Sequence, residues 1–277
     1  MIDSICLVTG ATSGIGKATA LGLAKLGATV VLMARDAARG EAAVREIKDA
    51  TEHPRIDLLL CDLSSQASIR AAADQFRRRY ERLSVLINNA AIVTRKRILT
   101  QDGLELTFAT NHLAPFLLTH LLLDRLHTGA PARVINVTAP STTKPDFDDL
   151  QGERKFGAIQ AFGASKACNL LFTHELARRL EGRGVTVNAY HPGIVRTGLM
   201  RQAPIPMRIF SSLLKLFALT PDRAAEGLVQ LASASQFEGV TGQLVHKGKV
   251  IPSPFGSDTA AQERLWAESV KLVGLDN

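Results

Sequence analysis

A glycine-rich turn near the N-terminus is the first segment whose residue types and spacing indicate chemistry. Residues 9–16 read TGATSGIG, directly after the apolar run ICLV and directly before a helical pattern. Such a turn presents backbone N–H groups and the positive end of a helix to a phosphate, and its glycines let the backbone approach closely. The context predicts a dinucleotide site rather than a mere tight turn. The residues expected to line it are Gly10, Thr12, Ser13, Gly14, Ile15 and Gly16.

The end of the next apolar run indicates which dinucleotide binds. An acidic residue at this strand tip would accept hydrogen bonds from a ribose 2′-hydroxyl and repel a 2′-phosphate. Here Ala34 occupies the tip and Arg35 follows it. Because a guanidinium matches phosphate geometry, we predict NADP(H) in preference to NAD(H). The alternative is a surface arginine paired with Asp36 or with a helix end.

Further motifs follow the later strands. Residues 88–91 read NNAA, residues 162–166 read FGASK and residues 191–197 read HPGIVRT. Together with the Gly-x-x-x-Gly-x-Gly spacing of residues 10–16, these motifs resemble the short-chain dehydrogenase/reductase family over essentially the whole chain. The segments LQGE at 150–153 and HELARRL at 174–180, and the tail from Arg264 to Leu275, resemble its retinol dehydrogenase-like branch.

The resemblance implies roles for individual residues. Asp62 and Leu63 match the adenine-binding pair, although Asp62 equally suits the N-cap of the following helix. Asn111 matches a helical asparagine that helps to hold a water chain to the active-site lysine, Lys166. Ala91 departs from the glycine of the family's Asn-Asn-Ala-Gly. The further cofactor-binding residues that the resemblance implies are Asn89, Ala90, Lys166, Pro192, Gly193 and Thr197.

Two side-chain oxygens of the family's reaction machinery are missing. In the family a tyrosine four residues before the lysine transfers the proton, and a serine holds the substrate oxygen. Here Phe162 and Ala139 stand at those positions. The candidate catalytic set is therefore Asn111, Ala139, Phe162 and Lys166, without an acid/base hydroxyl. Loss of positioned acid/base help costs roughly 10²–10⁴-fold in rate.

None of the neighbouring hydroxyls is a convincing replacement. We expect Thr138 to point to the opposite side of the strand tip from Ala139. Ser141 and Thr142 would serve only if their loop were remodelled. A helix advances about 100° per residue, so Ser165 is expected to face away from residue 162. His112 and Tyr190 are expected to pack rather than to act as a base or an acid.

Three interpretations of the function remain open. The first is an NADP(H)-binding short-chain dehydrogenase/reductase for a lipophilic ketone or alcohol, redox-impaired because the tyrosine and the serine were lost naturally or by deliberate substitution. The second is a non-redox cyclase or isomerase on the same scaffold, which positions a reactive substrate and uses the cofactor structurally. The third is a non-catalytic binding protein, against which the intact cofactor motifs argue.

The elements that must position these residues alternate along the chain. Apolar strands are expected at 5–8, 29–33, 56–60, 85–87, 133–137 and 185–189. Helical patterns cover 15–26, 38–48, 104–123 and 164–180, and the last quarter is expected to decorate the sheet edge. Continuous apolar strands that alternate with helices predict a parallel sheet covered on both faces. The expected fold is thus α/β: one doubly wound, Rossmann-like domain over residues 1–277.

Composition restricts the partners. The 277 residues carry a net charge of +7, but the cations are dispersed, and the run at 77–79 reads as a solvated helix face rather than a nucleic-acid site. The sequence shows no metal-ligand pattern and no apolar run that could span a bilayer, and its first strand leaves no room for a signal peptide or anchor. Three separated cysteines predict buried thiols in a reducing compartment, and a cytoplasmic location is expected.

The segment after Thr197 bears on the substrate. Residues 198–225 correspond to the family's mobile substrate lid, and Ile209, Leu213, Leu216 and Phe217 form an apolar helical face. As a lid, this face indicates a lipophilic or aromatic substrate. Structural packing, a contact with a second copy in a homo-oligomer, or a contact with a membrane surface are the alternatives.

Overall fold

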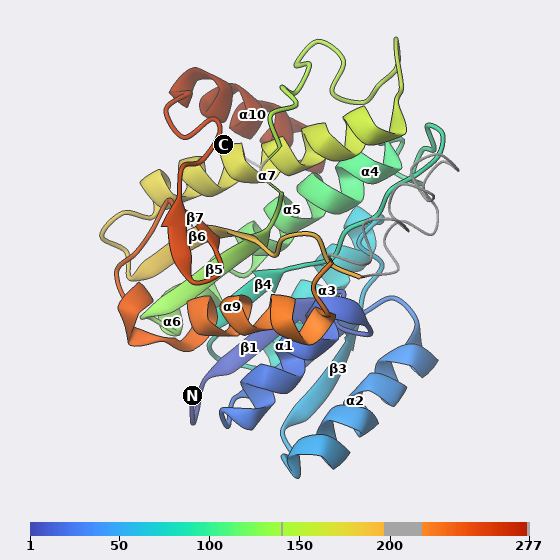
Figure 1. Ribbon diagram of the computed structural model, residues 1–277. Helices are drawn as coiled ribbons and strands as arrows, with labels where there is room; N and C mark the ends of the chain where they lie inside the picture. Colours follow the sequence, from blue (N-terminus) through green and yellow to red (C-terminus); the bar gives the residue numbers. More distant parts are fainter. Residues whose placement is uncertain (140, 197–217, 276–277) are drawn as a thin grey trace.

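The computed structural model describes residues 1–139, 141–196 and 218–275, and these residues form an eight-stranded sheet in the order β3-β2-β1-β4-β5-β6-β7-β8 (Figure 1). Neighbouring strands from β3 to β7 pair in parallel, and β8 pairs antiparallel to β7. The strands are β1 (Ile5–Thr9), β2 (Thr29–Ala34), β3 (Ile56–Leu60), β4 (Val85–Asn88), β5 (Ala132–Val137), β6 (Val185–His191), β7 (Leu244–His246) and β8 (Lys249–Ile251). The predicted doubly wound α/β domain is confirmed.

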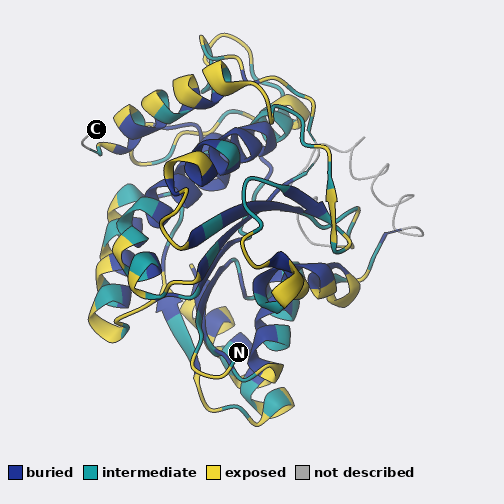
Figure 2. Ribbon diagram, turned by 90° about the vertical axis from the view of Figure 1, so that its left-hand side faces the viewer, coloured by how far each residue is buried: buried dark blue, intermediate teal, exposed yellow. Residues whose placement is uncertain are grey.

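Helices cover both faces of the sheet. One layer contains α1 (Gly14–Lys25), α2 (Ala37–Thr51) and α9 (Pro221–Ser233), and the other contains α3 (Gln66–Arg79), α5 (Ala114–Leu121), α7 (Ala158–Arg179) and α10 (Thr259–Val273). Figure 2 shows the buried residues concentrated on the strands and on the helix faces that meet them. Burial on both faces explains the nearly continuous apolar strands. All three cysteines are buried, as predicted.

Side-chain caps fix where several helices begin. The Asp36 carboxylate accepts from the Arg39 N–H at 2.9 Å and starts α2. The Asp258 carboxylate accepts from the Ala261 N–H at 3.1 Å and starts α10. Each cap satisfies a backbone donor that has no partner inside the helix. Short polar residues before apolar repeats therefore set the boundaries close to those expected from the sequence.

The helix predicted over residues 104–123 is interrupted. The structure contains α4 (Leu106–Phe108), a π-helical turn η1 (Ala109–Leu113), α5 and α6 (Leu123–Thr128). In η1 the Ala114 N–H bonds to the Ala109 carbonyl, and the Asn169 side chain of α7 donates to the Asn111 carbonyl at 2.9 Å. This second bond comes from a distant helix, so periodicity alone did not reveal the change of winding.

Helix α7 begins six residues earlier than the predicted 164. Phe162 therefore lies inside the helix, one turn before Lys166. Gly163 lies inside the helix, and its lack of a side chain lets the loop after β5 pack closely against it. A Cβ at Gly163 would lie 2.6 Å from Thr143 Oγ1 on that loop. Gly163 is thus a packing position inside the helix.

The last quarter extends the sheet rather than only decorating it. Strands β7 and β8 continue the sheet beyond β6, after the short 3₁₀ turn η3 (Ser235–Phe237). Helix α9 packs on α1, and α10 packs on α7. Within the ranges that the structure describes, no helix combines the length and the apolar character needed to cross a lipid bilayer.

The run of three arginines at 77–79 is largely engaged with the protein itself. Arg77 pairs with Asp124 at 3.2 Å, and Arg79 donates to the Leu58 carbonyl at 3.2 Å. The three residues also occupy the last turn of α3, where cations interact favourably with the helix dipole. These contacts fit the solvated helix face expected from the sequence.

Candidate functional site

The glycine-rich turn after β1 is packed too tightly to carry side chains at its key positions. Gly10 and Gly14 have φ angles of +65° and +58°, a conformation that favours glycine. A Cβ on Gly16 would lie 2.4 Å from the Gly10 carbonyl oxygen and 2.5 Å from Asn89 Nδ2. The turn therefore stays narrow, and its backbone is open to a ligand.

Hydrogen bonds join this turn to the loop after β4. Thr9 Oγ1 accepts from the Asn89 N–H at 2.9 Å and from the Ala90 N–H at 3.0 Å. Asn89 Nδ2 in turn donates to the Thr9 carbonyl at 2.9 Å. Two motifs about 80 residues apart thus form one rigid unit at the carboxyl edge of the sheet, where open α/β sheets bind ligands.

The N-terminus of α1 is suited to an anion. Ser13 has an extended backbone, but its hydroxyl does not cap the helix, and the first turn contains no acidic residue. The first N–H groups of α1 and the hydroxyls of Thr12 and Ser13 are thus available beside Ile15. Backbone donors at a positive helix end fit a pyrophosphate. The residues present therefore fit a dinucleotide.

At the tip of β2 a cationic side chain is exposed, and the nearest carboxylate serves as a helix cap. Arg35 is exposed directly after the buried Ala34. The nearby Asp36 carboxylate faces the α2 backbone as its N-cap. Across the described ranges no ion pair joins Arg35 to Asp36 or to another acid. The guanidinium is thus accessible to a phosphate.

The alternative role of Asp62 as a helix N-cap is wrong. Its carboxylate accepts from the Ser64 N–H at 2.9 Å and from the Ser64 hydroxyl at 2.7 Å, and so closes a turn after β3. Helix α3 is capped by Ser65, which accepts from the Ser68 N–H. The neighbouring Leu63 packs against the core. The proposed adenine contact of this pair stays a prediction.

We call the candidate catalytic residues Asn111, Ala139, Phe162 and Lys166 the reaction end of the site, and Lys166 is its charged group. Its side chain is 5% exposed, and Nζ donates to the Val137 carbonyl of β5 at 3.1 Å. Burial lowers the pKa of Lys166 to about 8, because no solvent shell stabilises the ammonium. Nζ lies 5.6 Å from the centre of the Phe162 ring. The side chain at position 162 is therefore next to the amine, and it carries no hydroxyl.

Asn111 braces the reaction end instead of touching Lys166. Its Oδ1 accepts from the Ile92 N–H at 2.8 Å, and its Nδ2 donates to the Ile92 carbonyl and to Ser165 Oγ, each at 3.0 Å. Ser165 donates to the Phe162 carbonyl at 2.7 Å. Both groups are buried and committed to these bonds. The water-chain role of Asn111 stays a prediction.

The other nearby hydroxyls lie on the loop after β5. Thr138 Oγ1 donates to the Lys166 carbonyl at 2.9 Å and is thereby engaged with α7. Ala139 follows it, and its carbonyl closes a turn with the Ser141 N–H at 2.7 Å. Ser141 Oγ accepts from the Thr143 N–H at 3.2 Å. The close packing at Gly163 also places Thr143 beside the reaction end, and no motif in the sequence indicated this position.

A histidine pair beside the Pro192-Gly193 turn was also missed. The rings of His191 and His246 stack with centroids 4.7 Å apart. His191 Nδ1 accepts from the Gly193 N–H at 3.4 Å, and burial together with the nearby His246 lowers the pKa of His191 to about 4. The two residues are register partners on β6 and β7, which only the strand order reveals.

The structure tests the predicted packing of His112 and Tyr190, but not the predicted lid. His112 is fully buried among aromatic rings, and the Tyr190 hydroxyl donates to the Ala224 carbonyl in the α9 layer, so both pack as expected. Thr197 and residues 198–217 lie outside the described residues. Leu219 forms a bridge with Val195, and α9 begins two residues later.

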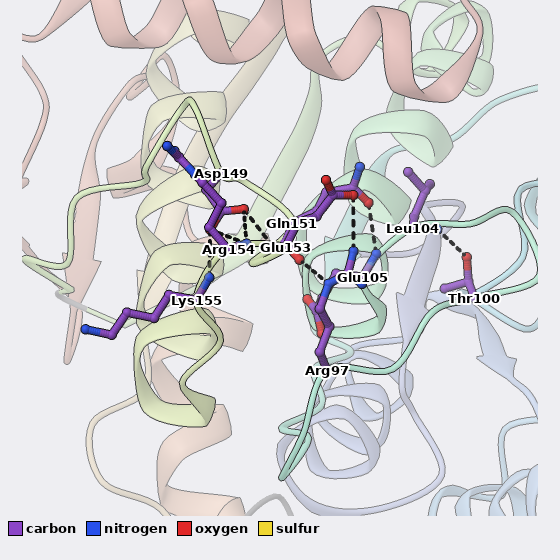
Figure 3. Close-up of polar contacts among 9 residues, drawn as sticks. All are labelled: Arg97, Thr100, Leu104, Glu105, Asp149, Gln151, Glu153, Arg154 and Lys155. Carbon is purple, nitrogen blue, oxygen red and sulfur yellow. Dashed lines mark hydrogen bonds and ion pairs between the residues drawn. The ribbon is translucent and has the colours of Figure 1, made fainter.

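A polar clamp ties the loop before α7 to the segment before α4 (Figure 3). Arg97 donates to the Gln151 carbonyl at 2.8 Å and to Glu153 at 3.3 Å. Gln151 Oε1 accepts from the Glu105 N–H at 3.1 Å, and the buried Glu105 carboxylate caps α4. The Asp149 carboxylate closes the loop by accepting backbone N–H groups of residues 153–155. The clamp thus holds the loop before α7 against the start of α4.

Comparison with known proteins assigns this arrangement to a family. The short chain dehydrogenase profile matches residues 4–206. The chain belongs to the short-chain dehydrogenase family. Human retinol dehydrogenase 13 is 42% identical to it over 279 residues, which cover 98% of this chain and 84% of that protein.

Solved structures of the short-chain dehydrogenase fold agree closely. An uncharacterized protein from Mycobacterium paratuberculosis superimposes with a TM-score of 0.79 at 31% identity, covering 99% of this chain and 95% of that one. The Pseudomonas aeruginosa RhlG/NADP active-site complex superimposes with a TM-score of 0.72 at 26% identity, covering 89% and 95%. The family and this neighbour support a nicotinamide cofactor for the short-chain dehydrogenase described here.

Proposed function

We propose that this chain binds NADP(H) and acts on a lipophilic ketone or alcohol, with oxidoreduction impaired by the absence of hydroxyls at Phe162 and Ala139. The observation that carries the proposal is the contrast at Lys166. The buried amine and its Val137 partner are in place, while the adjacent ring at position 162 has no oxygen. The natural or deliberate origin of the two residues does not alter this chemistry.

The bound nicotinamide would supply or accept a hydride at the substrate carbon. The chain's residues would have to supply the accompanying proton. Phe162 cannot donate one, and Ala139 cannot hold the substrate oxygen. The hydroxyls of Thr138 and Ser165 are already used in bonds to the backbone of α7. An alkoxide formed here would therefore lack a preorganised donor, which corresponds to a loss of roughly 10²–10⁴-fold.

The preference for NADP(H) is supported at the tip of β2. An exposed Arg35 and a carboxylate turned into a helix cap at Asp36 favour a 2′-phosphate over a free 2′-hydroxyl. The NADP in the RhlG complex, at 26% identity, is consistent with this preference.

A lipophilic substrate is supported by the rim of the site. Four exposed aliphatic side chains lie on segments that follow the carboxyl ends of the strands or start α7: Ile98, Leu99, Ile159 and Ile194. Ile159 is 64% exposed and precedes Phe162 by less than one helical turn. The retinol dehydrogenase relatives favour a retinoid-sized compound.

The second candidate is a non-redox cyclase or isomerase that uses the same pocket. The observation that favours it is the pair of apolar side chains at the two positions where the family places hydroxyls. A shaped, apolar pocket accelerates reactions that need positioning rather than proton transfer. A non-catalytic binding protein is the third candidate, and it is favoured only if the dinucleotide does not bind.

The decisive experiment restores the two oxygens. NADPH and NADH binding is first titrated by fluorescence with the unaltered chain. The double variant Phe162→Tyr/Ala139→Ser is then assayed with a panel of lipophilic ketones, aldehydes and alcohols. The matched control Phe156→Tyr/Ala161→Ser adds the same two hydroxyls nearby at partly exposed positions. NADPH-dependent turnover that rises roughly 10²–10⁴-fold only in the first variant supports the proposal.

The remaining outcomes separate the alternatives. Tight NADPH binding without any gain in turnover favours the cyclase or isomerase. Failure of both NADPH and NADH to bind contradicts both enzymatic candidates and favours the binding protein.

A further inference from the structure

Lys166 is a buried amine without a counter-charge. Of its three N–H donors, one is used by the Val137 carbonyl at 3.1 Å. Among the residues that the structure describes, no aspartate or glutamate forms an ion pair with it. Buried charges in proteins are normally paired, so this environment favours the neutral amine.

A neutral lysine amine is a nucleophile. Because burial lowers the pKa of Lys166 to about 8, its neutral fraction at pH 7 exceeds that of an ordinary exposed lysine on the order of 100-fold. Desolvation in an apolar pocket is the usual way in which proteins activate lysines for reaction with carbonyl groups.

The neighbours of the amine leave it free for such a reaction. The Phe162 ring lies 5.6 Å from Nζ in cation–π geometry, and it neither gives the amine a proton nor reacts with it. The bond between Thr138 Oγ1 and the Lys166 carbonyl joins the backbone of α7 to the tip of β5 and uses none of the donors on Nζ. It lies at the carboxyl edge of the sheet, beside the residues that bind the dinucleotide.

We infer that the Lys166 amine captures a lipophilic aldehyde covalently as an imine when the dinucleotide is absent. The amine nitrogen attacks the carbonyl carbon, a C–N bond forms and the C–O bond breaks. The oxygen leaves as water with the two amine hydrogens, so that R–CHO and H₂N–Lys give R–CH=N–Lys and H₂O. No electron donor or acceptor is required. The inference rests on the proposed function for the lipophilic carbonyl class of the ligand.

Occupancy of the site decides between capture and cofactor binding. The family resemblance places the nicotinamide ribose at Lys166, so a bound dinucleotide would cover the amine. NADP⁺ should therefore protect Lys166 from the aldehyde. This makes the cofactor-free protein the reactive form.

The test traps the imine. The full chain is incubated with retinal or decanal and sodium cyanoborohydride, which reduces imines in preference to aldehydes, between pH 6 and pH 9.5. The adduct is located by peptide mass spectrometry. Lys166→Met removes the amine, and Lys166→Arg keeps a cation that does not form a simple imine. Lys155→Met removes an exposed lysine outside the site as the matched control.

The expected result is labelling of Lys166 at least 10-fold above any exposed lysine at pH 7, rising with pH to a plateau above about pH 8. Saturating NADP⁺ should reduce this labelling at least 10-fold. Without the reductant, retinal should show the ultraviolet absorbance of an unprotonated imine, at shorter wavelength than the free aldehyde, and Lys166→Met should not. Circular dichroism verifies that both lysine variants fold.

Labelling of Lys166 no stronger than that of the exposed lysines, or total labelling that is the same in the unaltered chain and in Lys166→Met, would overturn the inference. NADPH titration on the same preparation separates the two proposals. NADPH binding without a Lys166 adduct contradicts the imine alone. An adduct without NADPH binding contradicts the proposed dinucleotide site and leaves the imine standing.

Discussion

The cofactor end and the reaction end of the site lie on the same sheet edge but are built in opposite ways. At the cofactor end, Thr9 and Asn89 exchange hydrogen bonds across neighbouring strands, and Gly16 leaves no space for a side chain. At the reaction end, Phe162 and Ala139 carry no side-chain oxygen, and within the described ranges the Val137 carbonyl is the one hydrogen-bond partner of Lys166 Nζ.

From this difference we expect ligand binding and proton transfer to be separable on this scaffold. Dinucleotide binding uses backbone donors and close packing, which depend on the fold as a whole. Proton transfer depends on single oxygens, and these can be removed with little change of shape. A chain can therefore keep the first capability while losing the second.

The largest expected effect tests the cofactor end. In Gly16→Val the added side chain would overlap the Gly10 carbonyl, which is backbone and cannot move aside easily. We expect the Kd for NADPH, measured by fluorescence, to rise roughly 1000-fold, or about 4 kcal/mol. Lys25→Ala, at the exposed far end of the same helix, should bind normally. Unchanged affinity in a folded Gly16→Val would show that the turn does not contact the cofactor.

The next largest expected effect concerns the contribution of the buried Lys166 amine to the free energy of unfolding. The folded-state pKa of Lys166 is about 8 against an ordinary 10.5, so the folded protein disfavours the charged amine. The resulting destabilisation is complete below pH 8 and disappears as the pH rises from 8 to about 10.5. It amounts to about 3 kcal/mol.

Lys166→Met should therefore raise the free energy of unfolding at pH 7 by up to about 3 kcal/mol. Urea denaturation from pH 7 to pH 10.5 measures this difference, which should shrink as the pH rises. A variant that is destabilised, or a difference that does not change with pH, would mean that the ammonium has a partner after all.

A smaller effect concerns the π-helical turn that supports the reaction end. His112 is fully buried, and burial lowers its pKa to about 4, an effect that Asn169 partly offsets. The unfolded chain takes up a proton below about pH 6.5, whereas the folded chain does so only near pH 4. Stability is thus lost as the pH falls through this window, by about 2 kcal/mol at pH 5.

Urea denaturation between pH 7 and pH 5 measures this loss of unfolding free energy. The loss should be smaller in His112→Gln, whereas the half-buried His127→Gln should show it in full. An equal loss of unfolding free energy in both variants would assign the pH dependence to other groups.

The smallest expected effect returns to the cofactor end. Arg35→Ala should weaken NADPH binding about 5- to 10-fold, near 1 kcal/mol, because an exposed guanidinium contacts the phosphate in water. NADH binding should stay unchanged, and parallel fluorescence titrations measure both. Equal weakening of the two dinucleotides would mean that Arg35 does not read the 2′-phosphate.

Local patterns predicted the elements well where the cause was local. Continuous apolar runs located the first six strands to within two residues, and the turn at 9–16 was located between β1 and α1. The helix predicted over 104–123 is confirmed over 106–121, but its π-helical turn was missed. In that turn the Asn111 carbonyl accepts a hydrogen bond from Asn169 on another helix, which periodicity does not reveal. The start of α7 was predicted six residues too late, at 164 instead of Ala158.

The sequence by itself determined the doubly wound fold, the residue types at the cofactor turn and the absence of hydroxyls at positions 139 and 162. These depend on apolar periodicity and on the identity of single residues. Only the tertiary structure decided that Asn111 binds Ile92 and Ser165, that Gln151 joins two loops, and that His191 stacks on His246. It also decided that Lys166 is buried and that no aspartate or glutamate of the described ranges pairs with it. The physical reason is that burial and pairing depend on which distant segments become neighbours.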